Sequence, residues 1–299
     1  MQDSQWHRPP LASTEISATD LAARLNLRRS RPGEWRGNCP ACGYVGAAVL
    51  SERGSRPLLW CASCQDSAGL AAALRQAAGG VLPPRAEPKD AVSDAERRAA
   101  KLARAAALWA SAEPITADCP AGRYLRHRRI EHVMESRALR WRSDTPHPAG
   151  GRRVALLAKI TATDGTLAGL QRIYLDRDGN KATVEPVKAS LGLIAGGAVR
   201  LQDCSAELVV GEGIETSAAA GALLSRPAWA AVSCGNLGRS LILPPEIRSI
   251  IIAVDADEPG QAAARAAWQR WAREGRRVRL ATPKEAGADF SDIVMGAGQ

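Results

Sequence analysis

Two short apolar segments rich in β-branched residues, 208–210 and 250–254, set the pattern of the C-terminal part of the chain. The first leads into Glu212 and the second into Asp255 and Asp257, and each is followed by an alanine-rich segment with helical character. Strand, acidic turn and helix, repeated in this order, are typical of a parallel α/β sheet. Because the carboxyl ends of parallel strands lie along one edge, we expect the three carboxylates to meet there.

The preceding region has a different pattern. Residues 152–184 alternate apolar and polar positions and contain Asp-Gly pairs at 164–165 and 178–179, which predicts an antiparallel meander with tight turns. Residues 94–110 place apolar side chains at helical spacing, and the proline-rich segment 81–90 predicts an extended linker.

These patterns predict an α/β fold class with four successive parts. The expected division is a zinc ribbon at 1–80, a linker and helix at 81–115, a mixed α+β segment at 116–200 and a parallel α/β domain at 201–299.

The zinc ribbon is predicted from the cysteines. Four of the seven form two C-x₂-C pairs, Cys39 with Cys42 and Cys61 with Cys64. This spacing suits one tetrahedral Zn²⁺, with the residues between the pairs folded as a β-hairpin. A site with four cysteine ligands has no open position, so we expect the zinc to be structural.

Side chains around the cysteines suggest a nucleic-acid surface. Exposed tryptophan beside arginine suits base stacking and phosphate contact on single strands, and the candidates are Trp35, Arg36 and Trp60. The alternative for Trp60 is that it only covers the zinc. A second candidate is Arg126, in the most basic stretch of the chain, where contact with template or nucleotide competes with a plain surface helix.

Net charge and hydropathy narrow the class of protein. The formal net charge of +9 indicates a polyanionic partner, although a GC-rich genome also raises arginine content. The N-terminal residues form no apolar signal segment, and no segment has the length of a membrane span. The odd cysteine count argues against a disulfide framework. We therefore expect a soluble, cytoplasmic protein with no membrane partner.

The acidic residues point to a metal ion. Clustered carboxylates repel one another and need a cation, and hard oxygen ligands favour Mg²⁺. The segments GEGIET (211–216), DADEPG (255–260) and GADFSDIV (287–294) resemble the three motifs of a Toprim domain. This is the metal-binding catalytic domain of bacterial-type primases, of type IA and II topoisomerases and of some nucleases. The resemblance covers roughly 200–299, is greatest to phage- and plasmid-type primases, and extends to the zinc ribbon, with which such primases bind template.

The resemblance implies roles for individual residues. Asp255 and Asp257 would hold Mg²⁺, with Asp289 and Asp292 in the third acidic motif, and Glu212 would be the general acid/base or a further ligand. Basic residues of the preceding region would form the other wall of the cleft, and the candidates are Arg172, Lys181 and Lys188.

The implied function is that of a DNA primase, which copies single-stranded DNA into short RNA primers from nucleoside triphosphates. The chain contains no G-x-x-x-x-G-K-[ST] motif, so a replicative helicase would be a separate partner. The alternatives are a Mg²⁺-dependent Toprim nuclease and a non-catalytic DNA-binding module. Topoisomerase activity would require a catalytic tyrosine, and Tyr44, Tyr124 and Tyr174 lie in no evident DNA-breakage domain.

Overall fold

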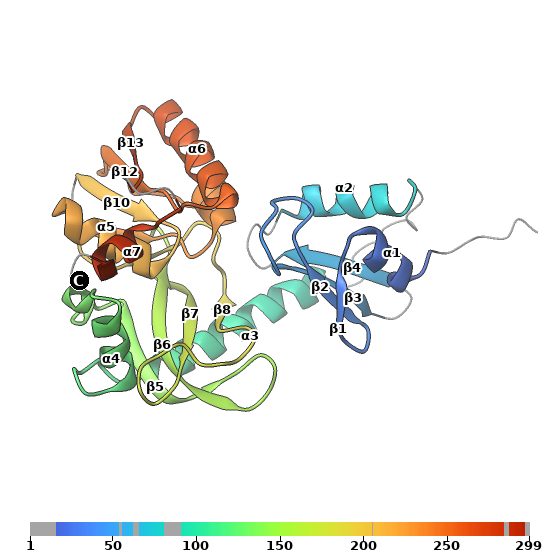
Figure 1. The fold of residues 1–299 in the computed structure, drawn as a ribbon, viewed down its shortest axis with the longest axis horizontal. Coiled ribbons are helices and arrows are strands. Elements are labelled where there is room, and N and C mark those ends of the chain that lie inside the picture. Colours follow the sequence, from blue (N-terminus) through green and yellow to red (C-terminus); the bar gives the residue numbers. More distant parts are fainter. Residues whose placement is uncertain are drawn as a thin grey trace, which may run out of the picture. The chain divides into compact units, whose positions relative to one another are not determined.

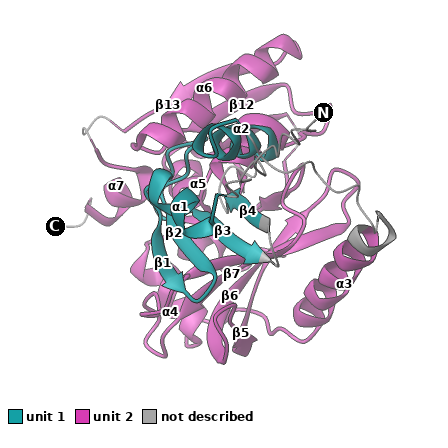
Figure 2. Cartoon of the chain, turned by 90° about the vertical axis from the view of Figure 1, so that its right-hand side faces the viewer, with its two compact units in different colours: residues 1–85 teal, residues 86–299 magenta. Residues whose placement is uncertain are grey.

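The computed structural model describes residues 16–53, 56–61, 66–80, 91–204, 206–283 and 287–296. The chain divides into two compact units, Met1–Arg85 and Ala86–Gln299 (Figure 1, Figure 2). The predicted linker at 81–90 and the fourth cysteine, Cys64, lie outside the described residues. No helix in the described ranges has the length and apolar character needed to cross a bilayer.

The N-terminal unit is a four-stranded antiparallel sheet with two helices (Figure 1). In chain order its elements are α1 (Ala18–Arg24), β1 (Arg28–Arg31), β2 (Glu34–Gly37), β3 (Ala48–Arg53), β4 (Arg56–Cys61) and α2 (Ser67–Ala77). The hairpin expected between the cysteine pairs is observed as β3 and β4. Its core is small and includes Leu21, Leu50 and Leu70.

Strand register decides which tryptophan is buried in this unit. Trp35 lies opposite Leu50 and is only 7% exposed, whereas Trp60 lies opposite Val49 and is 45% exposed. Arg36 also lies opposite Val49, so Arg36 and Trp60 share one face of the sheet. The expectation that Trp35 is exposed is therefore wrong, because this side chain belongs to the core.

The second unit is built on one nine-stranded sheet (Figure 1). Its first half comprises α3 (Ala91–Ala110), α4 (Pro120–His127), η1 (Glu131–Val133), β5 (Leu139–Pro146), β6 (Arg152–Thr161), β7 (Leu167–Leu175), β8 (Lys188–Gly192) and β9 (Ala198–Arg200). Its second half comprises β10 (Glu207–Gly211), α5 (Ile214–Leu224), β11 (Ala228–Ala230), η2 (Asn236–Ser240), β12 (Ser249–Ala253), α6 (Glu258–Arg273), β13 (Arg277–Ala281) and α7 (Phe290–Gly296).

The sheet joins an antiparallel half to a parallel half. Its order is β13-β12-β10-β11-β9-β6-β7-β8, and β5 pairs with β6. The predicted meander is confirmed for β6 and β7, but its next strand is β8 at 188–192, beyond the expected end at 184. Strand β9 is antiparallel to both β6 and β11. The sheet thus runs without a break across the boundary expected at residues 200–201.

The parallel half has helices on both faces. Val209 and Ile251 belong to the same core cluster as Ala218–Ala220 of α5. Successive side chains of a strand point to opposite faces, so Leu208 and Ile250 face the other side. There α6 packs on β12 and β13, as the view in Figure 1 also shows. The central strand β10 has β11 on one side and β12 on the other, which makes its carboxyl end a topological switch point.

Candidate active site at the carboxyl edge of the parallel strands

Three of the expected site residues follow two adjacent parallel strands. Glu212 comes directly after β10, and Asp255 and Asp257 come after β12. Val210 lies opposite Ile252 in the register of these strands, so both acidic turns begin at the same level of the sheet. Asp255 and Asp257 are close enough to raise the pKa of Glu212, and Asp257 is close enough to raise that of Asp255. The acidic residues therefore lie at the carboxyl edge of the parallel strands, as expected from the sequence.

Asp257 also begins helix α6. Its Oδ1 accepts a hydrogen bond from the amide of Gly260 at 2.8 Å, and Pro259 stands in the first turn. A Cβ on Gly260 would lie 2.8 Å from that same Oδ1 and 2.9 Å from the Cβ of Asp255. The motif 255–260 therefore needs glycine at its last position, because a side chain there would displace both aspartates.

The acidic edge concentrates negative charge. Burial raises the pKa of Glu212 to about 7, and Asp255 and Asp257 add to the rise. Burial likewise raises the pKa of Asp255 to about 6, with Asp289 and Asp257 contributing. Oδ1 of Asp255 is buried and has no hydrogen-bond partner among the described residues. An orphaned carboxylate oxygen among like charges is a fitting ligand for a hard cation.

The oxygen donors of these carboxylates suit magnesium with retained water. Within the described ranges, no three carboxylates bring their oxygens within 4.8 Å of one another; the three cysteines of the N-terminal unit do so with their sulfurs. Mg²⁺ is commonly held by one or two carboxylates and several waters, with substrate phosphates completing the shell. Glu212, Asp255 and Asp257 fit such a site.

The third acidic motif caps the last helix. The amide of Asp292 donates to Oδ1 of Asp289 at 2.9 Å, and the amide of Asp289 donates to Oδ2 of Asp292 at 3.0 Å. Helix α7 packs against α5, which places this cap beside the acidic edge, and Asp289 is near enough to raise the pKa of Asp255. Asp292 is exposed. Of the two, Asp289 is the one that belongs to the acidic edge.

Comparison with known families matches two segments of the chain. Residues 99–201 match a family described as a domain of unknown function, DUF7146, and residues 207–299 match the Toprim domain. The C-terminal region is a Toprim domain. The resemblance of the three sequence motifs is thereby confirmed for this region.

Solved primase structures are similar to larger parts of the chain. A primase catalytic domain bound to single-stranded DNA has 16% identity and a TM-score of 0.46, over 68% of this chain and 79% of that chain. The primase fragment of the bacteriophage T7 primase-helicase has 14% identity and a TM-score of 0.42, over 88% and 94%. The RNA polymerase domain of Mycobacterium tuberculosis primase has 20% identity and a TM-score of 0.40, over 68% and 80%. No curated protein matches the sequence.

A buried glutamate of the Toprim domain holds two of the expected lysines. Lys188 Nζ lies 3.0 Å from Oε1 of Glu215, and Lys181 Nζ lies 3.6 Å from the same oxygen. Tyr124 donates its hydroxyl to this carboxylate. The sequence reasoning did not single out Glu215, although an acidic residue at the start of the apolar helix 214–224 is a signal that a partner is required.

A thiol contacts the carboxylate at the end of β10. Cys234 donates its S–H to Oε2 of Glu212, and burial followed by the charge of Glu212 raises the pKa of this thiol well above its usual range. The sequence offered Cys234 no role. The contact fixes one oxygen of Glu212.

Two expected basic residues of the second unit have other surroundings. Arg172 is buried, and its guanidinium donates to the carbonyls of Pro146 at 3.0 Å and Ser190 at 3.2 Å. It therefore ties β7 to its neighbours and does not present a cation to the Toprim edge, contrary to expectation. Arg126 is exposed on α4 and donates to the carbonyl of Ala117 at 2.7 Å.

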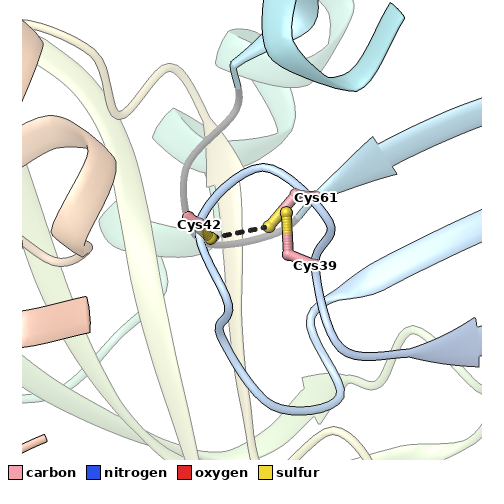
Figure 3. Close-up of side chains that lie close together, drawn as sticks. All are labelled: Cys39, Cys42 and Cys61. Carbon is pink, nitrogen blue, oxygen red and sulfur yellow. Dashed lines mark hydrogen bonds between the residues drawn. The ribbon is translucent and has the colours of Figure 1, made fainter. Parts of the chain in front are cut away.

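The described cysteines of the N-terminal unit form a cluster. The sulfurs of Cys39, Cys42 and Cys61 lie within 4.8 Å of one another, and Figure 3 shows them converging from the β2–β3 loop and the end of β4. Hydrogen bonding from Cys61, against the effect of burial, lowers the pKa of the Cys39 thiol to about 5. Three converging thiols, one of them readily ionised, fit the donor set of a structural Zn²⁺. The fourth predicted ligand, Cys64, lies outside the described residues.

The two tryptophans of this unit predict opposite phenotypes. Replacing Trp35 by alanine is expected to destabilise the unit by about 3–5 kcal/mol, the usual cost of truncating a buried aromatic. Replacing Trp60 by alanine is expected to leave the melting temperature nearly unchanged and to weaken binding of single-stranded DNA by about 1–3 kcal/mol, the worth of one stacked base. Thermal unfolding and fluorescence anisotropy with labelled oligonucleotide measure the two effects. If Trp60→Ala binds DNA as tightly as the wild type, Trp60 only covers the zinc.

Proposed function

We propose that the protein is a Mg²⁺-dependent DNA primase that makes short RNA primers on single-stranded DNA from nucleoside triphosphates. The observation that carries the proposal is the acidic edge of the Toprim domain, with Asp255 Oδ1 orphaned, together with two lysines held by Glu215, three residues after Glu212. Carboxylates that hold a metal and cations beside them are the pairing that a metal-bound triphosphate requires.

The role proposed for each residue follows from the position of its side chain. Asp255 and Asp257 would hold Mg²⁺ together with Glu212 and Asp289, and Glu212 is also the candidate to take the proton of the attacking 3′-hydroxyl. When bound, the metal neutralises phosphate charge and favours departure of pyrophosphate. Lys181 and Lys188, whose side chains are 34% exposed, are proposed to bind the phosphates.

Contacts to the template are proposed for the remaining candidates. Half-buried Arg36, which pairs with Glu34, and exposed Trp60 share one face of the sheet in the N-terminal unit, and Arg126 is exposed on α4 of the second unit. Tryptophan stacking and arginine–phosphate contact suit single strands without sequence preference. Zn²⁺ held by Cys39, Cys42, Cys61 and Cys64 would stabilise the N-terminal unit. A replicative helicase is a further proposed partner.

The test is primer synthesis by paired variants of Asp257. Purified protein is incubated with single-stranded DNA, labelled nucleoside triphosphates and Mg²⁺, beside Asp257→Asn and Asp257→Ala. Asparagine caps a helix about as well as aspartate, whereas alanine costs about 1 kcal/mol at this position. We expect both variants to lose RNA synthesis and only Asp257→Ala to lose stability.

Each result assigns a function. Short RNA products lost in Asp257→Asn support the primase. Mg²⁺-dependent cleavage of the DNA without synthesis indicates a nuclease. DNA binding with neither reaction indicates a non-catalytic binding module.

A further inference from the structure

Glu215 joins three separate segments of the second unit. It stands in the first turn of α5 and is 6% exposed. Its carboxylate accepts a hydrogen bond from Tyr124 of α4 and pairs with Lys188 at the start of β8 and with Lys181 in the β7–β8 connection. These three side chains all come from outside the Toprim domain.

The cluster is not required by packing alone. Burying a carboxylate is costly, and an apolar side chain at this position would be cheaper for stability. Burial acts to raise the pKa of Glu215, but Lys188, Lys181 and Tyr124 together outweigh it and hold this pKa far below its ordinary value. The carboxylate is therefore ionised, and it balances only one of the two ammonium charges.

The remaining positive charge lies at the carboxyl end of β10. Glu215 stands in the first turn of the helix that follows this strand, three residues after Glu212, and it holds both lysines there. The side chains of Lys188 and Lys181 are each 34% exposed, so a ligand can reach both. The cluster thus presents an accessible cation pair at the same carboxyl edge of the sheet as Glu212 and Asp255.

We infer that Glu215 is a positioning residue: it holds the ammonium groups of Lys181 and Lys188 side by side at the acidic edge, where they bind the triphosphate of the incoming nucleotide. Tyr124 also fixes the carboxylate, because its hydroxyl donates to Oε1, the oxygen that both lysines contact. The inference rests on the proposed function for the identity of the ligand.

The sign of the effect separates positioning from simple electrostatics. Replacing Glu215 by glutamine removes a negative charge next to two lysines. If only charge mattered, the more positive cluster would bind a polyphosphate more tightly. If Glu215 positions the lysines, their ammonium groups separate when it is neutral, and binding weakens.

Glu207 provides a matched control for this substitution. It lies at the opposite end of β10 and, like Glu215, pairs with two cations, Arg226 and Arg279. Glu207→Gln therefore makes the same chemical change in a paired glutamate of the same domain, away from the carboxyl edge. A general loss of stability would appear in both variants.

The experiment measures nucleotide binding and turnover separately. We expect Glu215→Gln to raise the KM for ATP in primer synthesis, and the Kd of MgATP in calorimetry, about tenfold with little change in kcat. Glu207→Gln should leave both constants unchanged. In a Lys188→Met background, Glu215→Gln should raise the Kd of MgATP by a smaller factor than in the wild type, because the two residues act together. The melting temperature of every variant is measured alongside.

The outcomes for the two proposals are distinguishable. An unchanged or lower Kd in Glu215→Gln, or an equal rise in Glu207→Gln, overturns the positioning role and leaves primer synthesis by the wild type intact. A wild type that makes no primers but binds MgATP through Glu215 overturns the primase and keeps the positioning role. A wild type that does not bind MgATP overturns the positioning role.

Discussion

Replacing Asp255 by asparagine is expected to abolish primer synthesis and to raise the melting temperature of the metal-free protein. The activity falls because the variant loses the charge of a carboxylate oxygen that has no partner within the described structure, and we expect a loss of about 10³-fold or more. The melting temperature rises because one of several mutually repelling charges is removed. In a domain of this size, 1 kcal/mol corresponds to about 2–4 °C.

The stability of the metal-free protein is expected to depend on pH with a defined sign. The pKa values of Glu212, about 7, and Asp255, about 6, lie above the ordinary values of 4.5 and 3.8, so these two groups bind more protons in the folded protein than in the unfolded chain. Stability of the metal-free wild type is therefore expected to fall as the pH rises from about 4 to about 7. The Asp255→Asn variant should show a shallower fall.

Magnesium should reverse this loss in the wild type. Binding to the folded state alone raises stability by mass action, so Mg²⁺ should raise the wild-type melting temperature at pH 8 more than at pH 5. It should do so less in Asp255→Asn. As a control, Asp144→Asn removes an exposed ion pair with Arg152 on the antiparallel half, and both melting temperature and synthesis should change little. Synthesis by Asp255→Asn within tenfold of the wild type would contradict the assignment.

Removal of zinc is expected to unfold the N-terminal unit and to leave the second unit folded. The unit has a small core, and zinc contributes about 10–16 kcal/mol to the folding of comparable zinc-finger peptides. Chelation, Cys39→Ser and Cys61→Ser should each make residues 16–80 sensitive to protease while the Toprim domain keeps its melting transition. Mass spectrometry should find one zinc per chain.

A cysteine outside the cluster supplies the control. Cys204 donates its thiol to the carbonyl of Glu207 at 3.0 Å, a bond that serine also makes, so Cys204→Ser should retain both the zinc and the fold. Cys64→Ser should behave like Cys39→Ser, since Cys64 is the predicted fourth ligand. Cooperative unfolding of the N-terminal unit after complete removal of zinc would show that its core suffices.

Local patterns were enough to predict the acidic edge. Apolar, β-branched segments ending in carboxylates define β10 and β12, and parallel strands necessarily bring their carboxyl ends together. Glu212, Asp255 and Asp257 therefore follow from sequence. The cysteine spacing was equally informative, because a metal site imposes its own geometry.

Contacts between distant segments were not predictable in the same way. Arg172 alternates with apolar neighbours on β7, but only the tertiary structure shows that its face of the strand is covered and lined by backbone carbonyls. The face of Trp35 depends on the register of β2 against β3, and one residue of slip would have exposed it. The partners of Glu215 lie far from it along the chain, so the sequence showed an acidic residue in an apolar helix without showing what neutralises it.

The pairing of β9 with β11 has a practical consequence for dissecting the protein. The segment that matches the Toprim family begins at residue 207, yet β11 is hydrogen-bonded to β9, which precedes it. A fragment cut at that point would carry a bare strand edge, and such edges promote aggregation. The smallest piece suited to recombinant expression or to transfer into another protein is therefore the whole unit from residue 86 onward.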